Sequence, residues 1–231
     1  MPSMTTSGSG MDERRDAGRA ARARVPRRAL GEWDDSRRTQ DALEVIVAQS
    51  RDRVPELVPI RHGRMAATPW THYRGAAAVM AADLATAEHS GLEVQLCGDA
   101  HILNFGLWAT PERNLSYDLR DFDETLPGPF EWDVQRLAAS LEVLAREVGL
   151  PDGAGAEAAV AMGKAYRLAM RRAASKGELE IWYDQVPLDR FVDFFVPEER
   201  EDIVSDISVE ARRRTSRGAA RKLFELGGGR R

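Results

Sequence analysis

Cys97-Gly98-Asp99-Ala100-His101-Ile102-Leu103-Asn104-Phe105-Gly106 is the stretch around which the rest of this chain is organised. Residues 93–97 alternate between polar and apolar side chains and predict a strand that ends where the turn after Cys97 begins. Residues 105–109 and 115–119 predict two short strands joined by a turn, and the second leads directly to Asp121-Phe122-Asp123. The hairpin is therefore expected to carry Asp121 back onto the turn that holds Asp99.

The turn and the Asp-Phe-Asp segment carry the groups that a metal–phosphate site needs. Asp99 begins a turn after a strand, a position suited to accepting a hydroxyl proton or orienting a hydroxyl that attacks a phosphate. Asn104 offers an amide oxygen, and Asp121 and Asp123 offer carboxylates that point to the same side if the strand continues. His101 either orients the backbone or contacts the site. Asp and Asn also shape tight turns on their own. The His inside the turn and the acidic pair Asp121 and Asp123 after the hairpin favour a metal–phosphate site.

The composition predicts a soluble protein with enough apolar residues for a core. Hydrophobic residues make up 43% and charged residues 30% of the 231 residues, and no apolar run is long enough to predict a membrane-spanning helix. The N-terminus lacks the apolar stretch of a secretory signal, so a cytoplasmic protein without a membrane partner is expected. The single cysteine, Cys97, excludes an intramolecular disulfide and a Cys-based zinc cluster. Cys97 is interpreted as a small buried residue rather than a nucleophile.

Charge is spread unevenly along the chain. Residues 1–38 contain nine Arg and six acidic residues, and residues 211–231 contain seven Arg, one Lys and one Glu. The remainder has 16 basic and 30 acidic residues, a balance that argues against nucleic acid as a partner. Residues 1–38 are rich in Ser, Gly and Arg, and they are expected to form a disordered basic tail.

Helical patterns dominate the chain outside the predicted strands. The clearest follows a break at residues 126–129, where apolar residues recur at i, i+3 and i+4 up to Gly149. With two or three short strands between runs of helix, the pattern predicts an α+β fold in which helix dominates. The other helices are predicted at residues 40–54, 60–67, 75–89, 155–176, 188–195 and 198–226.

Residues 69–75 are aromatic and basic, and they predict a loop near the site. Arg74 in this loop either grips a phosphate or carboxylate of the site or stacks on Trp70 or Tyr73. Both interpretations stay open at this point. The histidines other than His101 show no spacing typical of metal ligands.

Residues 98–104 resemble the catalytic loop of the protein-kinase-like fold, especially its aminoglycoside and choline phosphotransferase branch, which reads Gly-Asp, a His two residues on, and then Asn. Asp121-Phe122-Asp123 looks like the metal-binding Asp-Phe-Gly of the same fold. Over about residues 40–224 the chain is more closely similar to the bacterial family called domain of unknown function 2252. The segments that carry this closer similarity are residues 74–75, 98–106, 121–133 and 136–140.

The resemblance implies the helical, catalytic half of a kinase-like fold, with a short β-hairpin carrying the site. It implies that Asp99 is the catalytic base and that Asn104 and Asp121 are metal ligands. Asp133 and Arg136 lie in the helix that follows. The resemblance implies that they tie this helix to the catalytic loop as structural support.

The chain departs from an ordinary kinase in the order of its parts. A kinase-like enzyme places a Gly-rich phosphate loop and an ATP-pairing Lys before the catalytic loop. Here the first Lys is Lys164, and no Gly-rich strand–turn–strand precedes Asp99. The resemblance therefore suggests a permuted order in which the nucleotide-cradling lobe follows the helical part, and residues 39–231 are expected to be an incomplete, truncated domain.

The expected function is Mg²⁺-dependent phosphoryl transfer from ATP to a small-molecule acceptor, with little or no turnover by this chain alone. A missing lobe also predicts self-association through the apolar face that it leaves exposed. One alternative is a non-catalytic nucleotide-binding or regulatory protein on the same scaffold. The lower-ranked alternative is a metal-dependent phosphohydrolase that uses Asp99, His101, Asp121 and Asp123.

Overall fold

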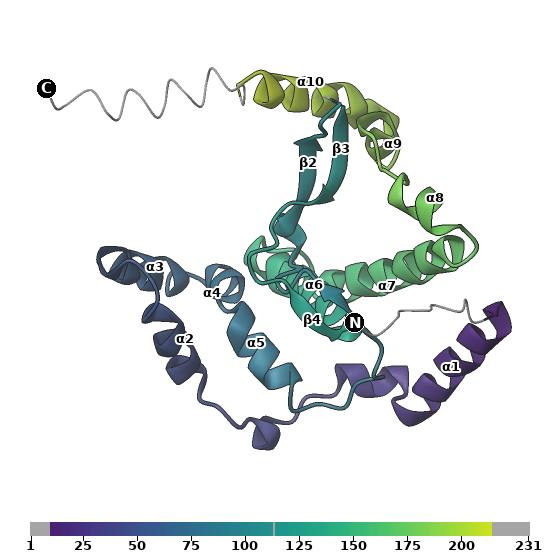
Figure 1. The fold of residues 1–231 in the computed structure, drawn as a ribbon. Helices are drawn as coiled ribbons and strands as arrows, with labels where there is room; N and C mark the ends of the chain where they lie inside the picture. The colour runs from purple at the N-terminus through teal and green to yellow at the C-terminus, as the bar shows by residue number, and fades with distance from the viewer. Residues whose placement is uncertain (1–9, 113, 214–231) are drawn as a thin grey trace, which may run out of the picture. The chain divides into compact units, whose positions relative to one another are not determined.

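The computed structural model describes residues 10–112 and 114–213 as a helix-dominated α+β structure (Figure 1). Contacts divide the chain into two compact units, the first comprising Met1–Gly106 and Leu119–Trp182 and the second Leu107–Asp118 and Tyr183–Arg231. All the site residues predicted from the sequence belong to the first unit. None of the described helices combines the length and the apolar character needed to cross a bilayer.

Several short helices of the first unit precede the turn. α2 (Ala42–Ser50) begins after Asp41, whose carboxylate accepts the backbone N–H groups of Leu43 and Glu44 at 2.9 and 3.0 Å. Ile46 of α2 packs with Met65 and Ala76 in a small buried cluster. The remaining helices of the unit are α1 (Met11–Arg24), α3 (Val58–Met65), α4 (Pro69–Gly75), α5 (Ala77–Leu84), α6 (Phe130–Glu147), α7 (Ala154–Ala173) and α8 (Glu178–Trp182), with 3₁₀ turns η1 (Arg27–Gly31), η2 (Asp35–Arg37), η3 (Pro55–Leu57) and η4 (Ile102–Asn104).

Residues 69–75 form helix α4 where the sequence predicted a loop. The Thr68 hydroxyl accepts the backbone N–H of Thr71 at 3.2 Å, and the Thr71 hydroxyl oxygen accepts the backbone N–H of Thr68 at 3.0 Å. This reciprocal pair satisfies two of the free donors at a helix start. Pro69 occupies the first helical position, where no backbone N–H is required. The loop prediction was wrong because a Pro in this position begins a helix.

Two strands of the first unit frame the turn. β1 (Glu93–Leu96) pairs antiparallel with β4 (Leu126–Pro129), with Leu96 opposite Leu126 and Glu93 opposite Pro129. The break predicted at residues 126–129 is therefore a strand. A two-stranded sheet accepts its prolines because each strand has a free edge. β4 leads directly into α6, whose first residue, Phe130, donates its backbone N–H to the carbonyl of Leu92 at 3.1 Å, just before the start of β1.

The basic segment predicted to be disordered is helical from Met11 to Arg24. Ala21 and Val25 are buried, and Arg24 donates a hydrogen bond to the carbonyl of Ser90 at 2.6 Å. These contacts with residues far along the chain order a segment whose composition predicts disorder. Residues 1–9 of the predicted tail lie outside the described residues.

The second unit is built on a pair of strands and two helices. β2 (Phe105–Ala109) pairs with β3 (Leu115–Leu119), as the sequence predicted. Tyr117 of β3 stacks on Phe191 of α9 (Leu188–Val192) with ring centroids 4.5 Å apart, and its backbone N–H donates to the carbonyl of Val186 at 2.8 Å. α10 (Pro197–Arg213) completes the described part of this unit. Residues 214–226 of the helix predicted at 198–226 lie outside the described residues.

Candidate functional site

The turn between β1 and β2 begins at a glycine that no other residue can easily replace. Gly98 has a φ of +85°, and a Cβ at this position would collide with the backbone carbonyl oxygen of Glu124. The Thr125 hydroxyl donates to the carbonyl of Leu96 at 2.6 Å. The segment after the hairpin therefore folds back onto the turn, as the sequence predicted.

Polar side chains on one face of α6 hold the backbone of the turn. The two carboxylate oxygens of Asp133 accept the backbone N–H groups of Cys97 and Gly98 at 2.7 and 3.0 Å. The hydroxyl of Ser140, which is fully buried, accepts the N–H of Ile102 at 3.0 Å. Because these side chains are spaced at helical intervals, α6 presents a row of acceptors to the free donors of the turn.

Asp99 is paired with Arg136, which is only 3% exposed. Both Nε and Nη2 of Arg136 lie 2.7 Å from Oδ1 of Asp99. Nη2 also donates to the carbonyl of Tyr73 at 2.8 Å, and the guanidinium lies over the Tyr73 ring, 4.2 Å from its centroid. Both contacts fall on Oδ1, so Oδ2 of Asp99 forms no hydrogen bond to a described residue, and the Asp99 side chain keeps 20% of its surface exposed.

Tyr73 closes this arrangement from α4. Its hydroxyl donates to the backbone carbonyl of Arg136 at 2.6 Å. Burial raises the pKa of Tyr73 to about 12, so the phenol remains a protonated donor at neutral pH. Tyr73 and Arg136 thus each donate a hydrogen bond to the backbone carbonyl of the other, and these two bonds join α4 to α6.

His101 is buried beside Asp99 as a neutral ring. Its Nε2 lies 3.7 Å from Oδ2 of Asp99, and its ring meets Trp70 edge-on with centroids 6.0 Å apart. Burial lowers the pKa of His101; the charge of Asp99 opposes this shift, whereas the charges of Arg136 and Arg74 add to it. Nδ1 of His101 is buried without a hydrogen-bond partner among the described residues.

Asn104 joins the turn to the Asp121 segment. Its side-chain nitrogen donates to the backbone carbonyls of Asp99 at 2.8 Å and of Asp121 at 3.4 Å. The buried thiol of Cys97 donates to the same Asp121 carbonyl at 3.3 Å, and burial raises the pKa of Cys97. A raised pKa disfavours the thiolate, so Cys97 packs here instead of serving as a nucleophile. The bonds of Asn104 use its amide nitrogen and leave its amide oxygen without a hydrogen bond among the described residues.

Asp121 and Asp123 are exposed and do not continue a strand, because β3 ends at Leu119. The backbone N–H of Asp123 donates to Oδ1 of Asp121 at 3.3 Å, which closes a local turn. The condition under which both carboxylates point to the same side is therefore not met.

Within residues 10–112 and 114–213, no three His, Cys, Asp or Glu side chains gather as metal ligands. Mg²⁺, however, is usually held by one or two carboxylates together with substrate phosphates and water. Asn104 and Asp121 are joined through the Asn104 amide nitrogen and the Asp121 backbone carbonyl, and their side chains are of the donor types that such a shared site uses. They do not make a cage built from protein ligands alone.

Arg74 lies exposed near the C-terminal end of α4. Its positive charge reaches the ring of His101, where it lowers the pKa. The cation that stacks on Tyr73 is Arg136, and Trp70 and Tyr73 stack on each other with ring centroids 6.3 Å apart. Among the described residues, no side-chain hydrogen bond, ion pair or ring contact is found for Arg74, and the interpretation that it grips a phosphate or carboxylate stays a prediction.

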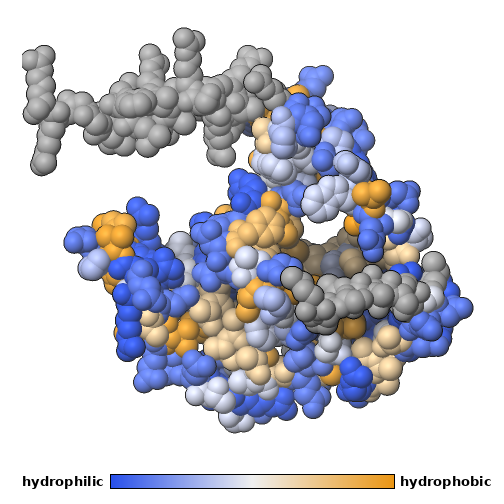
Figure 2. Space-filling model, in the orientation of Figure 1, coloured by the Kyte–Doolittle hydropathy of each residue, from blue (hydrophilic) through white to orange (hydrophobic). Residues whose placement is uncertain are grey.

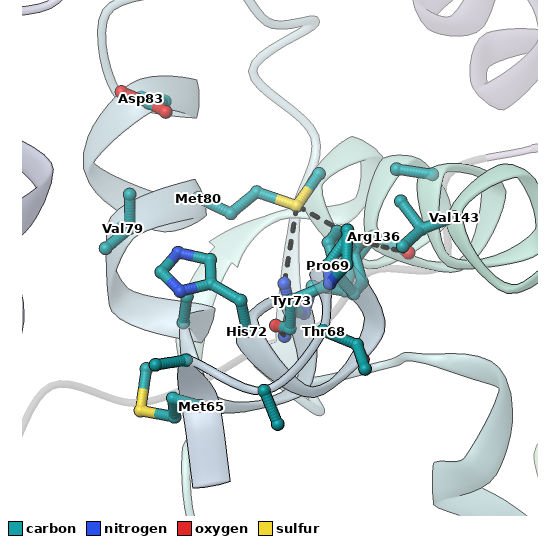
Figure 3. Close-up of a pocket in the computed structure, with 14 residues that line it drawn as sticks. Met65, Thr68, Pro69, His72, Tyr73, Val79, Met80, Asp83, Arg136 and Val143 are labelled. Carbon is teal, nitrogen blue, oxygen red and sulfur yellow. Dashed lines mark hydrogen bonds between the residues drawn. The ribbon is translucent and has the colours of Figure 1, made fainter. Parts of the chain in front are cut away.

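Arg136 and Tyr73 also line an open groove of about 610 Å³ (Figure 3). Tyr73 and Arg136 both approach the sulfur of Met80 in its wall, at 3.4 and 3.7 Å. His72 and Met65 are also drawn against this groove. Most of the lining is apolar, so Arg136 separates an apolar groove from the polar turn that it supports.

Sequence reasoning missed the contribution of Ser140 and Tyr73 to the site. Asp133, Arg136 and Ser140 are three and four positions apart, a helical spacing of polar residues that signals a common face. That signal was available beside the apolar pattern of the same helix. Tyr73 carries no comparable signal, because its partner Arg136 lies 63 positions away.

Residues 53–231 match the model of a family described as an uncharacterized protein conserved in bacteria, DUF2252. The chain belongs to this family. The DUF2252 match contains the whole candidate site, from Arg74 to Ser140. No curated protein and no solved structure matches the chain.

Proposed function

We propose that this DUF2252 chain carries a kinase-like phosphoryl-transfer centre, in which a phosphoryl group passes from ATP to the hydroxyl of a small molecule with the help of Mg²⁺. The observation that carries the proposal is the position of Asp99: one carboxylate oxygen is fixed by Arg136, and the other remains free beside the neutral ring of His101. The resemblance of residues 98–104 to a kinase-like catalytic loop supports the same assignment.

Asp99 is suited to orienting an acceptor hydroxyl. The pairing of Oδ1 with a buried guanidinium sets the direction of the side chain, so that Oδ2 accepts a hydrogen bond from the incoming hydroxyl. The neutral His101 adds no positive charge next to that oxygen. Asp99 thus holds the nucleophile in line and takes up its proton as the transfer proceeds.

Asn104 and Asp121 would hold the metal, with Asp123 as a further exposed carboxylate. When bound there, Mg²⁺ neutralises charge on the phosphate oxygens. Arg74 supplies a free guanidinium near His101, suited to a phosphate oxygen. These residues come from three separate segments, namely α4, the turn after Gly98 and the segment after β3.

A non-catalytic nucleotide-binding or regulatory protein is the second candidate, and one observation favours it. The Asp99–Arg136 pair is buried on its Arg side and bonded to Tyr73. A carboxylate with a purely structural role would form the same kind of buried pair. Under this candidate, Asp99 holds α4 and α6 together and touches no substrate.

Two measurements on the full chain separate the two candidates. Calorimetric titration measures Mg·ATP binding, and an ATP hydrolysis assay measures the ADP formed when water accepts the phosphoryl group. Phosphoryl transfer predicts that Asp121→Ala weakens Mg·ATP binding about tenfold or more. It predicts that Asp99→Asn keeps the binding and abolishes the slow ADP formation that is the most this incomplete centre is expected to support. The control Asp152→Asn, at an exposed acid before α7, should leave both unchanged. Binding that needs no Mg²⁺ and survives Asp121→Ala would instead support the non-catalytic protein.

A further inference from the structure

α7 is a long helix with only one covered side. Of its 20 residues only Gly155 is buried, where a Cβ would collide with Glu142 of α6. Tyr166 stacks on Phe130 of α6 with centroids 6.4 Å apart. Gly155 and Tyr166 therefore mark the side of α7 that packs against α6 (Figure 1).

The opposite side of α7 carries an exposed row of five residues, here called the outer row. Its members are spaced three, four, four and three positions apart. At about 100° per residue they fall within about 40° of the direction opposite Gly155. Val160 is 59% and Leu168 48% exposed. The outer row is Glu157, Val160, Lys164, Leu168 and Arg171.

We propose that the outer row is a self-association surface, on which α7 pairs antiparallel with α7 of a second copy about a two-fold axis at Lys164. The 3-4-4-3 spacing reads the same in both directions, so residues equally distant from Lys164 meet across the axis. Val160 then lies opposite Leu168 of the second copy, and Glu157 lies opposite Arg171. A two-fold axis repeats both contacts, which is how an isologous interface is built.

The charges of the outer row select a second copy as the occupant. An acid stands at its N-terminal end and a base at its C-terminal end, so an antiparallel copy offers the complementary charge at both ends at once, whereas a parallel copy places like charges together. Neither Glu157 nor Arg171 forms an ion pair or side-chain hydrogen bond among the described residues. The pairing gives both of them partners.

Exposed apolar residues also flank the outer row at both of its ends. Val148 and Leu150 precede α7, and Leu179 and Trp182 follow it, with exposed fractions of 60%, 53%, 74% and 79%. An antiparallel copy brings the leading pair of one molecule toward the trailing pair of the other. Because α7 spans only about 30 Å, the interface is small, and the dimer is expected to form in the micromolar range or above.

Sedimentation velocity of the full chain over a range of concentrations tests the pairing. The wild type should shift from monomer to dimer as concentration rises. Leu168→Glu should weaken the dimer about tenfold or more, because it places a charge opposite Val160. Met170→Glu is the matched control: Met170 is equally exposed, at 51%, but lies off the outer row. It should leave the dimer unchanged.

Charge reversal tests the direction of the pairing. Glu157→Arg and Arg171→Glu should each weaken the dimer about tenfold by placing like charges together, and the double variant should restore it. Lys164→Ala should tighten the dimer a few-fold, since it removes two like charges at the axis. All of these positions are exposed, so the variants should fold as the wild type does.

A wild type that remains monomeric at every concentration would overturn the proposal. A dimer that Met170→Glu weakens as much as Leu168→Glu does would place the contact elsewhere. Failure of the double charge reversal to restore the dimer would exclude the antiparallel register. None of these outcomes bears on phosphoryl transfer, because no outer-row residue belongs to the candidate site.

Discussion

α6 and α7 are neighbouring helices of similar length, 18 and 20 residues, but α6 buries polar side chains whereas α7 exposes large apolar ones. On α6 the most deeply buried side chains are polar: Arg136 is 3% exposed and Ser140 is 0% exposed. On α7 the large aliphatic side chains Val160 and Leu168 are about half exposed. The separate hydrophobic patches on the surface in Figure 2 show that such exposure recurs elsewhere on the molecule.

The difference follows from what each helix packs against. α6 lies beside a tight turn whose backbone N–H groups have no strand or helix partner, and buried donors need acceptors. Asp133 and Ser140 supply these acceptors, and Arg136 is buried because Asp99 pairs with it. α7 packs against α6 and has no such turn to satisfy. The face of α6 that is buried is therefore determined by the backbone groups of the turn beside it. The number of apolar residues on the helix does not determine it.

The largest expected effect is the loss of the buried guanidinium of α6. Arg136→Met leaves the Asp99 carboxylate unpaired and removes the bond to the carbonyl of Tyr73. Breaking a buried pair from one side costs about 3–5 kcal/mol of unfolding free energy. Urea denaturation followed by tryptophan fluorescence measures the loss.

Arg146→Met is the control on the same helix. Arg146 is 80% exposed and pairs with Glu142 one turn earlier, a contact that contributes about 0.3–0.5 kcal/mol. Equal losses for the two variants would contradict the claim that the polar face of α6 holds the fold. A loss at Arg136 that the second substitution Asp99→Leu partly reverses would sharpen the claim, because it assigns the cost to the unpaired carboxylate.

Much of the arrangement around the turn could be predicted from the sequence. The alternation before Cys97 predicts β1, the pattern at residues 105–119 predicts the β2–β3 pair, and periodicity predicts α6. These signals are local, because each depends on residues within one element. The fold-back of Asp121 onto the turn also follows from chain order, since a hairpin returns the chain to where it began.

The parts that could not be predicted depend on contacts between distant residues. The hydrogen bonds between Tyr73 and Arg136 join residues 63 positions apart, and no local sequence pattern predicts them. The pairing of residues 126–129 with β1 overrides two prolines that locally suggest a break. The hydrogen bond from Arg24 of α1 to the carbonyl of Ser90 likewise joins residues 66 positions apart. Periodicity gives the position of a helix, whereas its buried face is settled by its neighbours.

A smaller effect is expected from acid, because His101 lies in the network that α6 supports. Burial lowers the pKa of His101 below its value of about 6.5 in the unfolded chain. Between these two pKa values the unfolded chain binds more protons, so unfolding free energy falls as pH drops below about 6.5, by at most ~1.4 kcal/mol per pH unit. Denaturation midpoints between about pH 7.5 and 5.5 measure the slope.

His101→Asn should flatten this dependence, since it removes the group that titrates. His89→Asn, at an exposed histidine before β1, should leave the slope unchanged. A slope that persists in His101→Asn would assign the acid sensitivity to another group. Such a result would separate His101 from the charge network of Asp99 and Arg136.

The smallest effect is expected on α7, and it has the opposite sign. Gly163 lies in the interior of α7, and a Cβ there would meet nothing within 4 Å. Gly163→Ala should therefore raise the unfolding free energy by about 0.5–1 kcal/mol, because Ala restricts the unfolded chain more than Gly does and favours helix. On α6, Ala145→Gly should lower it by more than this amount, because Ala145 is buried. A destabilising Gly163→Ala would mean that the side of α7 at Gly163 is covered in solution, and the contrast between the two helices would then fail.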